Sequence, residues 1–213
     1  MRFSGWSTAL LALLAGALFG PLMAWRRFGP LDFWWGMSLS VGALVFLSCA
    51  ADKSQRSALL QDWKNGLAGK IGLGILSALV LYGVFWVGNE VSRAVLPAAA
   101  KDIAAVYGFK QDADILRIGL LIIFVIGPGE EFFWRGFLQR RWQKRLGLFS
   151  GWLLAAGFYA LVHVPSENPM LVLSALVCGL YWGALYARFR SALLVAFSHT
   201  LWDLLIFVLF PLG

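Results

Sequence analysis

Two neighbouring acids and one base stand in a strongly apolar part of this 213-residue chain. Glu130 and Glu131 follow the apolar run Ile115 to Ile126 and the sequence Gly127-Pro128-Gly129, and Arg135 comes four residues after Glu131. Residues four apart share a helical face, so Arg135 can pair with one acid and leave the other free for proton transfer. Because Gly and Pro interrupt a helix, we expect both acids in the first turn of a new helix, where free amides and the helix dipole hold carboxylates.

The chain has only two histidines, and both lie in apolar runs. An ionisable group near the centre of a membrane helix costs about 2.5 kcal/mol or more, so each one is a hypothesis about function. One histidine could merely bridge two helices, but His163 and His199 together with two glutamates indicate a polar site. Asp203 lies one turn after His199, on the same face, where it can hold the imidazole tautomer or accept a hydrogen bond linked to the substrate.

These side chains are suited to hydrolysis. A carboxylate in a poorly hydrated site can take a proton from water, and an imidazole can polarise a carbonyl group. Two histidines and a carboxylate would also suffice as three zinc ligands, with water in the fourth position. We expect no cofactor, and zinc stays open as an alternative.

The elements that position these residues are membrane helices. The chain is 60% hydrophobic and only 14% charged, and its mean hydropathy is +0.75, which leaves too few polar side chains to cover a soluble domain. About 20 apolar residues span a bilayer core. The sequence therefore predicts an all-α polytopic bundle of about seven transmembrane helices in a single domain, 1–213. The apolar runs lie near residues 5–25, 31–50, 70–89, 115–131, 149–165, 169–187 and 191–210.

The loop charges predict the orientation of the bundle. If the cluster from Arg140 to Arg145 is cytoplasmic, alternation places eleven basic residues inside and six outside, with the amino terminus inside. Arg26 and Arg27 alone would favour the opposite orientation of the first helix. Basic loops between apolar runs are typical of an anionic membrane surface, so we expect lipid rather than nucleic acid as the partner.

Three segments resemble the motifs of a known family. They are Glu130-Glu131-Phe132-Phe133-Trp134-Arg135, Tyr159-Ala160-Leu161-Val162-His163 and His199-Thr200-Leu201-Trp202-Asp203. This order is similar to that of CPBP, the CAAX proteases and bacteriocin-processing enzymes, also called the ABI family, and the likeness covers residues 110–210. The resemblance implies an intramembrane endopeptidase of the glutamic type, although the family has often been labelled metalloprotease.

The resemblance also implies roles. Glu130 would be the general base acting on water, and His163 would help to hold that water. His199 with Asp203 would face the scissile carbonyl, while Glu131 and Arg135 would brace the site. The chain departs from the family pattern at Tyr159, where phenylalanine is usual, and at Asp203, where asparagine is common. An ionised aspartate cannot donate to an oxyanion, whereas a protonated one can.

The family resemblance further implies a multi-pass protein of a bacterial cytoplasmic membrane that cleaves a membrane-associated peptide or protein. The alternatives are a non-catalytic proton-relay transporter and a membrane scaffold or immunity protein built on the same buried residues. A rhomboid-like serine protease is disfavoured because Ser198 and His199 are helix neighbours that point about 100° apart.

Overall fold

A computed structural model describes residues 5–110 and 113–212 of the chain. The described part is almost wholly helical, so the all-α fold class is confirmed. Arg2 and Asp112, which bear on the loop charges, lie outside the described residues.

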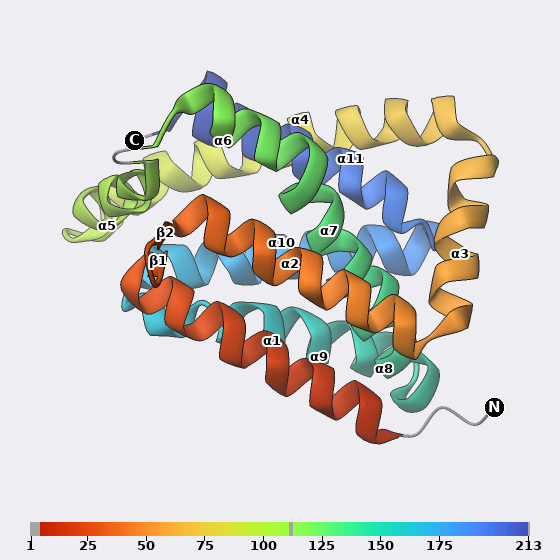
Figure 1. The fold of residues 1–213 in the computed structure, drawn as a ribbon. Coiled ribbons are helices and arrows are strands. Elements are labelled where there is room, and N and C mark those ends of the chain that lie inside the picture. Colours follow the sequence, from red (N-terminus) through yellow and green to blue (C-terminus); the bar gives the residue numbers. More distant parts are fainter. Residues whose placement is uncertain (1–4, 111–112, 213) are drawn as a thin grey trace.

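The first half of the chain begins with two membrane helices and a tight turn. Helix α1 (Gly5–Trp25) is joined to α2 (Phe33–Ala51) by a small hairpin, β1 (Arg27–Phe28) and β2 (Leu31–Asp32). A short polar helix, α3 (Lys53–Lys64), then crosses one end of the bundle and leads to the long α4 (Leu67–Val95) (Figure 1). Helix α5 (Ala99–Tyr107) and a single 3₁₀ turn (Gly108–Lys110) follow at the opposite end.

The second half carries the motifs. One continuous helical path runs from Ile115 to Leu146, and two π-helical segments interrupt its α-helical hydrogen bonding. The pieces are α6 (Ile115–Leu121), η2 (Ile122–Ile126), α7 (Gly127–Phe133), η3 (Trp134–Gln139) and α8 (Arg140–Leu146).

Three helices complete the bundle. They are α9 (Leu148–Leu161) with a 3₁₀ turn (Val164–Ser166), α10 (Pro169–Phe189), and α11 (Ala192–Asp203), which continues as the π-helical segment η5 (Leu204–Leu209). Side-chain caps fix several of the starts: Asp32, Asn168 and Ser191 each accept the backbone N–H three residues further on.

Among the described residues, six helices are long and apolar enough to cross a membrane. They correspond to six of the seven predicted runs, and the chain is a multi-pass membrane protein. The seventh run, 115–131, is the interrupted path through α6, η2 and α7. The segment between α4 and α6 contains the short helix α5.

Glycines allow α7 to lie close to its neighbours. A Cβ at Gly127 would lie 2.3 Å from Thr200 Oγ1 of α11, and one at Gly129 would lie 2.3 Å from Val41 Cγ1 of α2. Small residues let membrane helices approach closely. The Gly127-Pro128-Gly129 sequence therefore seats the acidic segment between α2 and α11 and does not end the helix.

Candidate active site

The predicted residues come from three helices and surround one cavity. The cavity measures about 260 Å³, and Glu130 of α7, Tyr159 and His163 at the end of α9, and His199 and Asp203 of α11 line it. All five side chains are buried. Glu131 and Arg135 do not line the cavity and lie behind its wall.

Glu131 links two helices through one oxygen. Its Oε1 lies 2.7 Å from His199 Nδ1 and 2.8 Å from Arg135 Nη1, and all three side chains are at least 97% buried. An ionised carboxylate accepts hydrogen bonds and cannot donate them, so both nitrogens act as donors to Glu131. His199 Nδ1 is therefore used in the bond to Glu131, and Nε2 is the ring nitrogen available to a substrate in the cavity.

Arg135 has further partners. Its Nη2 lies 3.4 Å from the Cys178 carbonyl oxygen, and its guanidinium lies over the rings of Tyr159 and Trp182, 4.9 and 5.5 Å from their centroids. A planar guanidinium can satisfy an acid, a carbonyl and two aromatic faces at the same time. Arg135 therefore joins α7 and η3 to α9 and α10.

Asp203 lies on the same face as His199, as its spacing predicts. Its Oδ2 is 3.4 Å from His199 Nε2, a longer contact than the 2.7 Å bond from Glu131 to Nδ1. Glu131 therefore makes the closer bond to the ring, and a role of Asp203 in holding the imidazole tautomer stays a prediction. Asp203 faces the nitrogen that points toward the cavity.

His163 and Tyr159 form the third side of the site. His163 Nδ1 lies 2.7 Å from the Tyr159 carbonyl oxygen, so the backbone of α9 orients this ring. The carbonyl can only accept, which makes Nδ1 the donor and leaves Nε2 as an acceptor in the neutral ring. The Tyr159 side chain lines the same cavity as Glu130.

Glu130 is the acid that remains available. Its Oε2 makes no hydrogen bond within the described protein, although the side chain is only 3% exposed. A buried carboxylate oxygen without a protein partner is a candidate acceptor for a water molecule. The two adjacent acids therefore have different surroundings. Glu131 is paired with Arg135, and Glu130 faces the cavity.

An α-helical segment begins at Gly127 with Glu130 in its first turn, but it continues an unbroken helical path and is not a free helix end. The π-helical segment η2 leads directly into α7, and the Gly127 amide bonds the Ile122 carbonyl. Pro128 has no N–H to donate, and such a residue is commonly accommodated by a local change in hydrogen bonding. Helix-end amides are therefore not what holds Glu131; Arg135 and His199 do so.

Two contributors had no signal in the sequence. Trp182 stacks on His199, with 3.8 Å between ring centroids and 24° between the planes, and its indole N–H donates to Ser198 Oγ at 3.1 Å. In the apolar run of α10, nothing distinguishes this tryptophan from a lipid-facing one. Ser198 also lies 3.0 Å from Ser77 Oγ and does not line the cavity, so it packs α11 against α4 and α10.

A metal ion does not fit the donors as they are arranged. In the described parts of the chain, no group of three or more His, Cys, Asp and Glu side chains is placed to share an ion. Each ring uses Nδ1 for its bond within the protein, His199 toward Glu131 and His163 toward the Tyr159 carbonyl, and keeps Nε2 open. A catalytic zinc needs three protein ligands converging on an open position.

Comparison with known proteins agrees with the motifs. Residues 112–205 match the family model described as type II CAAX prenyl endopeptidase Rce1-like. Searches of curated proteins and of solved structures gave no match. The match covers all three motif segments and the helices that carry them, α6 to α11. Over residues 112–205 the chain therefore carries a domain of the family that its motifs predicted, the CAAX proteases and bacteriocin-processing enzymes.

Proposed function

We propose that the chain is an intramembrane endopeptidase of the glutamic type, in which Glu130 activates water for hydrolysis of a peptide bond in a membrane-associated substrate. The proposal rests on the different surroundings of two adjacent acids, Glu130 and Glu131. Each acid has an Oε2 without a protein partner, but only Glu130 lines the cavity, whereas Glu131 does not line it and bonds Arg135 and His199 through Oε1.

The reaction begins with proton transfer. A water molecule held between Glu130 and His163 Nε2 gives a proton to the Glu130 carboxylate, and its oxygen attacks the carbonyl carbon of the scissile bond. The carbonyl oxygen takes up the negative charge. His199 Nε2, when protonated, or a protonated Asp203 donates to this oxyanion. Glu130 then passes its proton to the leaving nitrogen, and the C–N bond breaks.

Residues around His199 hold its ring in position. Glu131 and Arg135 fix the His199 ring on its Nδ1 side, and Trp182 supports the face of the ring. Groups held before the reaction need little rearrangement in the transition state, which is the main source of electrostatic catalysis. The proposed mechanism assigns no step to a metal ion.

The arrangement gives less support to a proton-relay transporter. Transporters of that kind usually pair broken helices in their two halves. In the described residues, the π-helical interruptions η2, η3 and η5 all begin at Ile122 or later, and α2 and α4 run without one.

The test is a comparison of new amino termini in membranes from cells that produce the wild type, Glu130→Gln or Glu90→Gln. Glu90 is exposed and does not line the cavity, so its variant is the matched control for loss of one carboxylate. We expect precursors to be cut by the wild type and Glu90→Gln and to stay uncut with Glu130→Gln. Equal processing by all three proteins would overturn the proposal.

A further inference from the structure

The cavity extends from the buried acids to one end of the bundle only. Its deep part is lined by Glu130, His199 and Trp182, and its outer part by Tyr107, Phe109 and Leu212. The outer residues belong to the end where the hairpin, α5 and the carboxyl terminus lie, on the left of Figure 1. Of the described lining residues, none belongs to α3 or α8, which occupy the opposite end.

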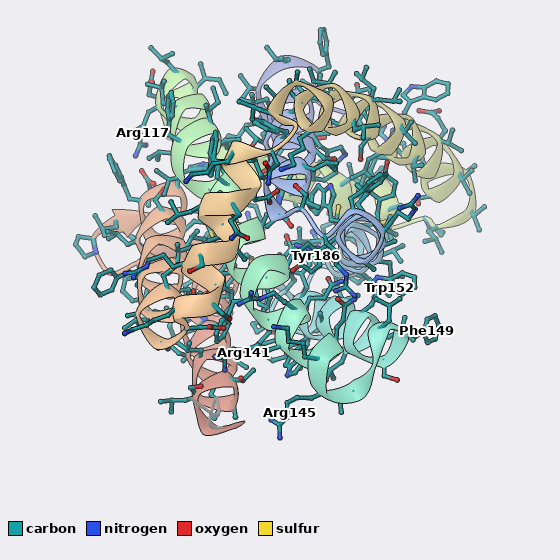
Figure 2. The ribbon with its side chains drawn as sticks, turned by 90° about the vertical axis from the view of Figure 1, so that its right-hand side faces the viewer. Arg117, Arg141, Arg145, Phe149, Trp152 and Tyr186 are labelled. Carbon is teal, nitrogen blue, oxygen red and sulfur yellow. The ribbon has the colours of Figure 1, made fainter. Side chains whose placement is uncertain are left out.

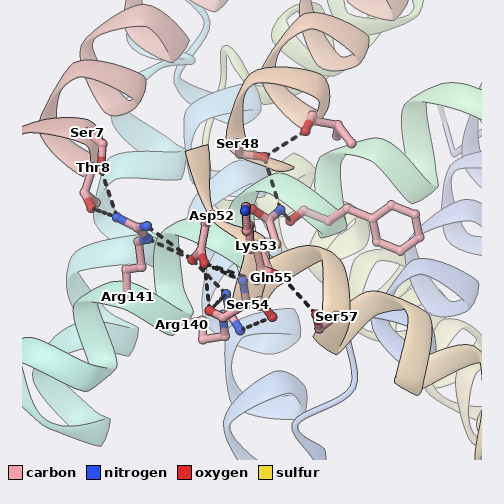
Figure 3. Close-up of polar contacts among 12 residues, drawn as sticks. Ser7, Thr8, Ser48, Asp52, Lys53, Ser54, Gln55, Ser57, Arg140 and Arg141 are labelled. Atoms are coloured by element: carbon pink, nitrogen blue, oxygen red, sulfur yellow. Dashed lines mark hydrogen bonds and ion pairs between the residues drawn. The ribbon is translucent and has the colours of Figure 1, made fainter. Parts of the chain in front are cut away.

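A network of ion pairs closes that opposite end. Asp52 Oδ2 lies 3.0 Å from Arg140 Nη2 and 3.2 Å from Arg141 Nη2, and Arg141 Nη1 reaches Thr8 Oγ1 of α1 at 2.8 Å (Figure 3). Arg141 and Arg145 are labelled in Figure 2, which looks onto this end. The network ties α1, α2 and α8 together, so the site has no opening here.

Asp62 seals the neighbouring part of the same end. It pairs with Lys70 Nζ at 2.6 Å, and its second oxygen accepts the Leu193 amide at 2.9 Å. The end of α3 is thereby joined to the starts of α4 and α11.

The two ends differ in charge. The closed end carries ten described Lys and Arg residues and only two acids, Asp52 and Asp62. The open end carries six Lys and Arg residues and five described acids. The bases of the closed end are Lys53, Arg56, Lys64, Lys70, Arg140, Arg141, Lys144, Arg145, Arg188 and Arg190. Loops rich in Lys and Arg remain in the cytoplasm. The closed end is therefore expected on the cytoplasmic side, and the open end of the cavity on the opposite side of the membrane.

The cavity also has a side facing the membrane core. Helices α4 and α10 both contribute lining residues, and Val84 and Leu173, one from each, are 48% exposed although they line the cavity. The two helices meet where the Ser77 hydroxyl bonds Tyr181, at 3.1 Å. Toward the open end they are bridged by α5, which packs on both. A window lined by apolar side chains therefore lies between α4 and α10.

We propose that this site cleaves on the extracytoplasmic side, and that its substrate is the apolar segment of a membrane-anchored polypeptide entering between α4 and α10. An extended apolar chain matches the lining of the window, and lipid already surrounds it at that depth. A water-soluble peptide has no equivalent route from the closed, basic end. This inference rests on the proposed endopeptidase function.

Orientation can be tested without any substrate. In a background carrying Cys49→Ser and Cys178→Ala, single cysteines are introduced as Ser92→Cys, Val95→Cys or Ser57→Cys. Ser92 lines the outer cavity, Val95 is exposed at the same end, and Ser57 is exposed on α3. A membrane-impermeant maleimide should label the first two in intact bacterial cells and the third only after permeabilisation. Labelling of Ser57→Cys in intact cells, or protection of Val95→Cys there, overturns the proposal.

The window is tested by filling it. Gly88 lines the cavity and has open space around it, and Gly83 on the same helix is exposed, equally unobstructed and outside the cavity. Gly88→Trp should abolish processing of the precursors cut by the wild type, and Gly83→Trp should leave it intact. Normal processing by Gly88→Trp overturns entry through this window.

The side of cleavage completes the test. New amino termini that depend on Glu130 should map to the extracytoplasmic flank of a membrane segment in each precursor. Termini on the cytoplasmic flank would overturn this inference while leaving the endopeptidase function in place. If Glu130→Ala changed no termini, the proposed function itself would fail, and maleimide labelling would still decide which way the cavity faces.

Discussion

His199 Nδ1 lies 2.7 Å from Glu131 Oε1, the same carboxylate oxygen that Arg135 Nη1 approaches at 2.8 Å. A ring on α11 is thus held by an acid on α7, and the acid is held in turn by an arginine one turn further along its own helix. Both bonds are charge-assisted and fully buried, which makes them strong and directional. The nitrogen left free on His199 therefore has a fixed direction toward the cavity.

Substitution of Glu131 by glutamine should impair catalysis more than folding. Glutamine keeps the volume but offers Arg135 a neutral acceptor, and it weakens the bond to His199. A charge-assisted hydrogen bond is worth about 1.5 to 3 kcal/mol, so turnover should fall about 10- to 100-fold. Precursor processing is measured at matched membrane levels, with Glu90→Gln as the control. Wild-type turnover would show that Glu131 does not position His199.

Arg135→Lys should also reduce turnover, because one ammonium cannot contact Glu131, the Cys178 carbonyl and two ring faces at once. Arg135→Ala should be worse, since it leaves Glu131 buried without its cation, at a cost on the order of 3 to 5 kcal/mol. The measurements are membrane accumulation and thermal unfolding in detergent. Equal melting temperatures for Arg135→Ala and wild type would contradict the claim that the buried pair of Arg135 and Glu131 stabilises the protein.

Gly127→Ala tests the close approach of α7 to α11. The added Cβ would meet Thr200, next to His199, and overpacking typically costs about 1 to 3 kcal/mol. We expect a lower melting temperature and reduced processing. Gly157→Ala is the matched control, because nothing lies within 4 Å of its new Cβ and alanine favours helix by up to about 1 kcal/mol. If the two variants behaved alike, the glycine contact would not set the geometry of the site.

The sequence predicted much of this arrangement because its signals are local. Hydrophobic runs gave the positions of the membrane helices, and the spacing of Arg135 after Glu131 predicted a pair that the structure contains. Asp203 likewise lies on the face of His199. Helical periodicity states which residues share a face, and these pairs lie within one turn.

Contacts between helices could not be read in the same way. The bond from Glu131 to His199 joins residues 68 positions apart, and periodicity does not say which helices are neighbours. The Gly127-Pro128-Gly129 sequence predicts a break, yet close packing against Val41 and Thr200 requires the same small residues in a continuous helix. Trp182 had no signal because stacking on His199 depends on how α10 meets α11.

Asp52 gives the closed end a pH dependence. Burial would raise the pKa of this carboxyl, but the Ser54 hydroxyl and the charges of Arg140 and Arg141 together hold it below its usual value. A lowered folded-state pKa contributes stability that is present above the unfolded value, about 3.9, and is lost as the pH falls through the folded value. Melting temperatures in detergent should therefore drop below about pH 4 more steeply for wild type than for Asp52→Asn.

At neutral pH the same substitution should destabilise the protein by on the order of 3 kcal/mol, since two arginines lose their acid. Asp102→Asn serves as the control because Asp102 accepts the hydrogen bond from Asn168 Nδ2 through its backbone carbonyl and not through its carboxylate. Identical acid profiles for wild type and Asp52→Asn would contradict the role assigned to the Asp52 carboxylate.

The central claim is that Glu130 activates the water, and it is tested most directly by hydrolysis with purified protein in lipid nanodiscs. The substrate is a precursor segment identified by its new amino terminus, and each protein is exhaustively chelated before assay. We predict that chelated wild type and Glu90→Gln cleave at equal rates, whereas Glu130→Gln loses about 10²- to 10⁴-fold, the usual contribution of a general base. Cleavage by Glu130→Gln at the wild-type rate, or loss of wild-type activity on chelation that zinc restores, would contradict the account.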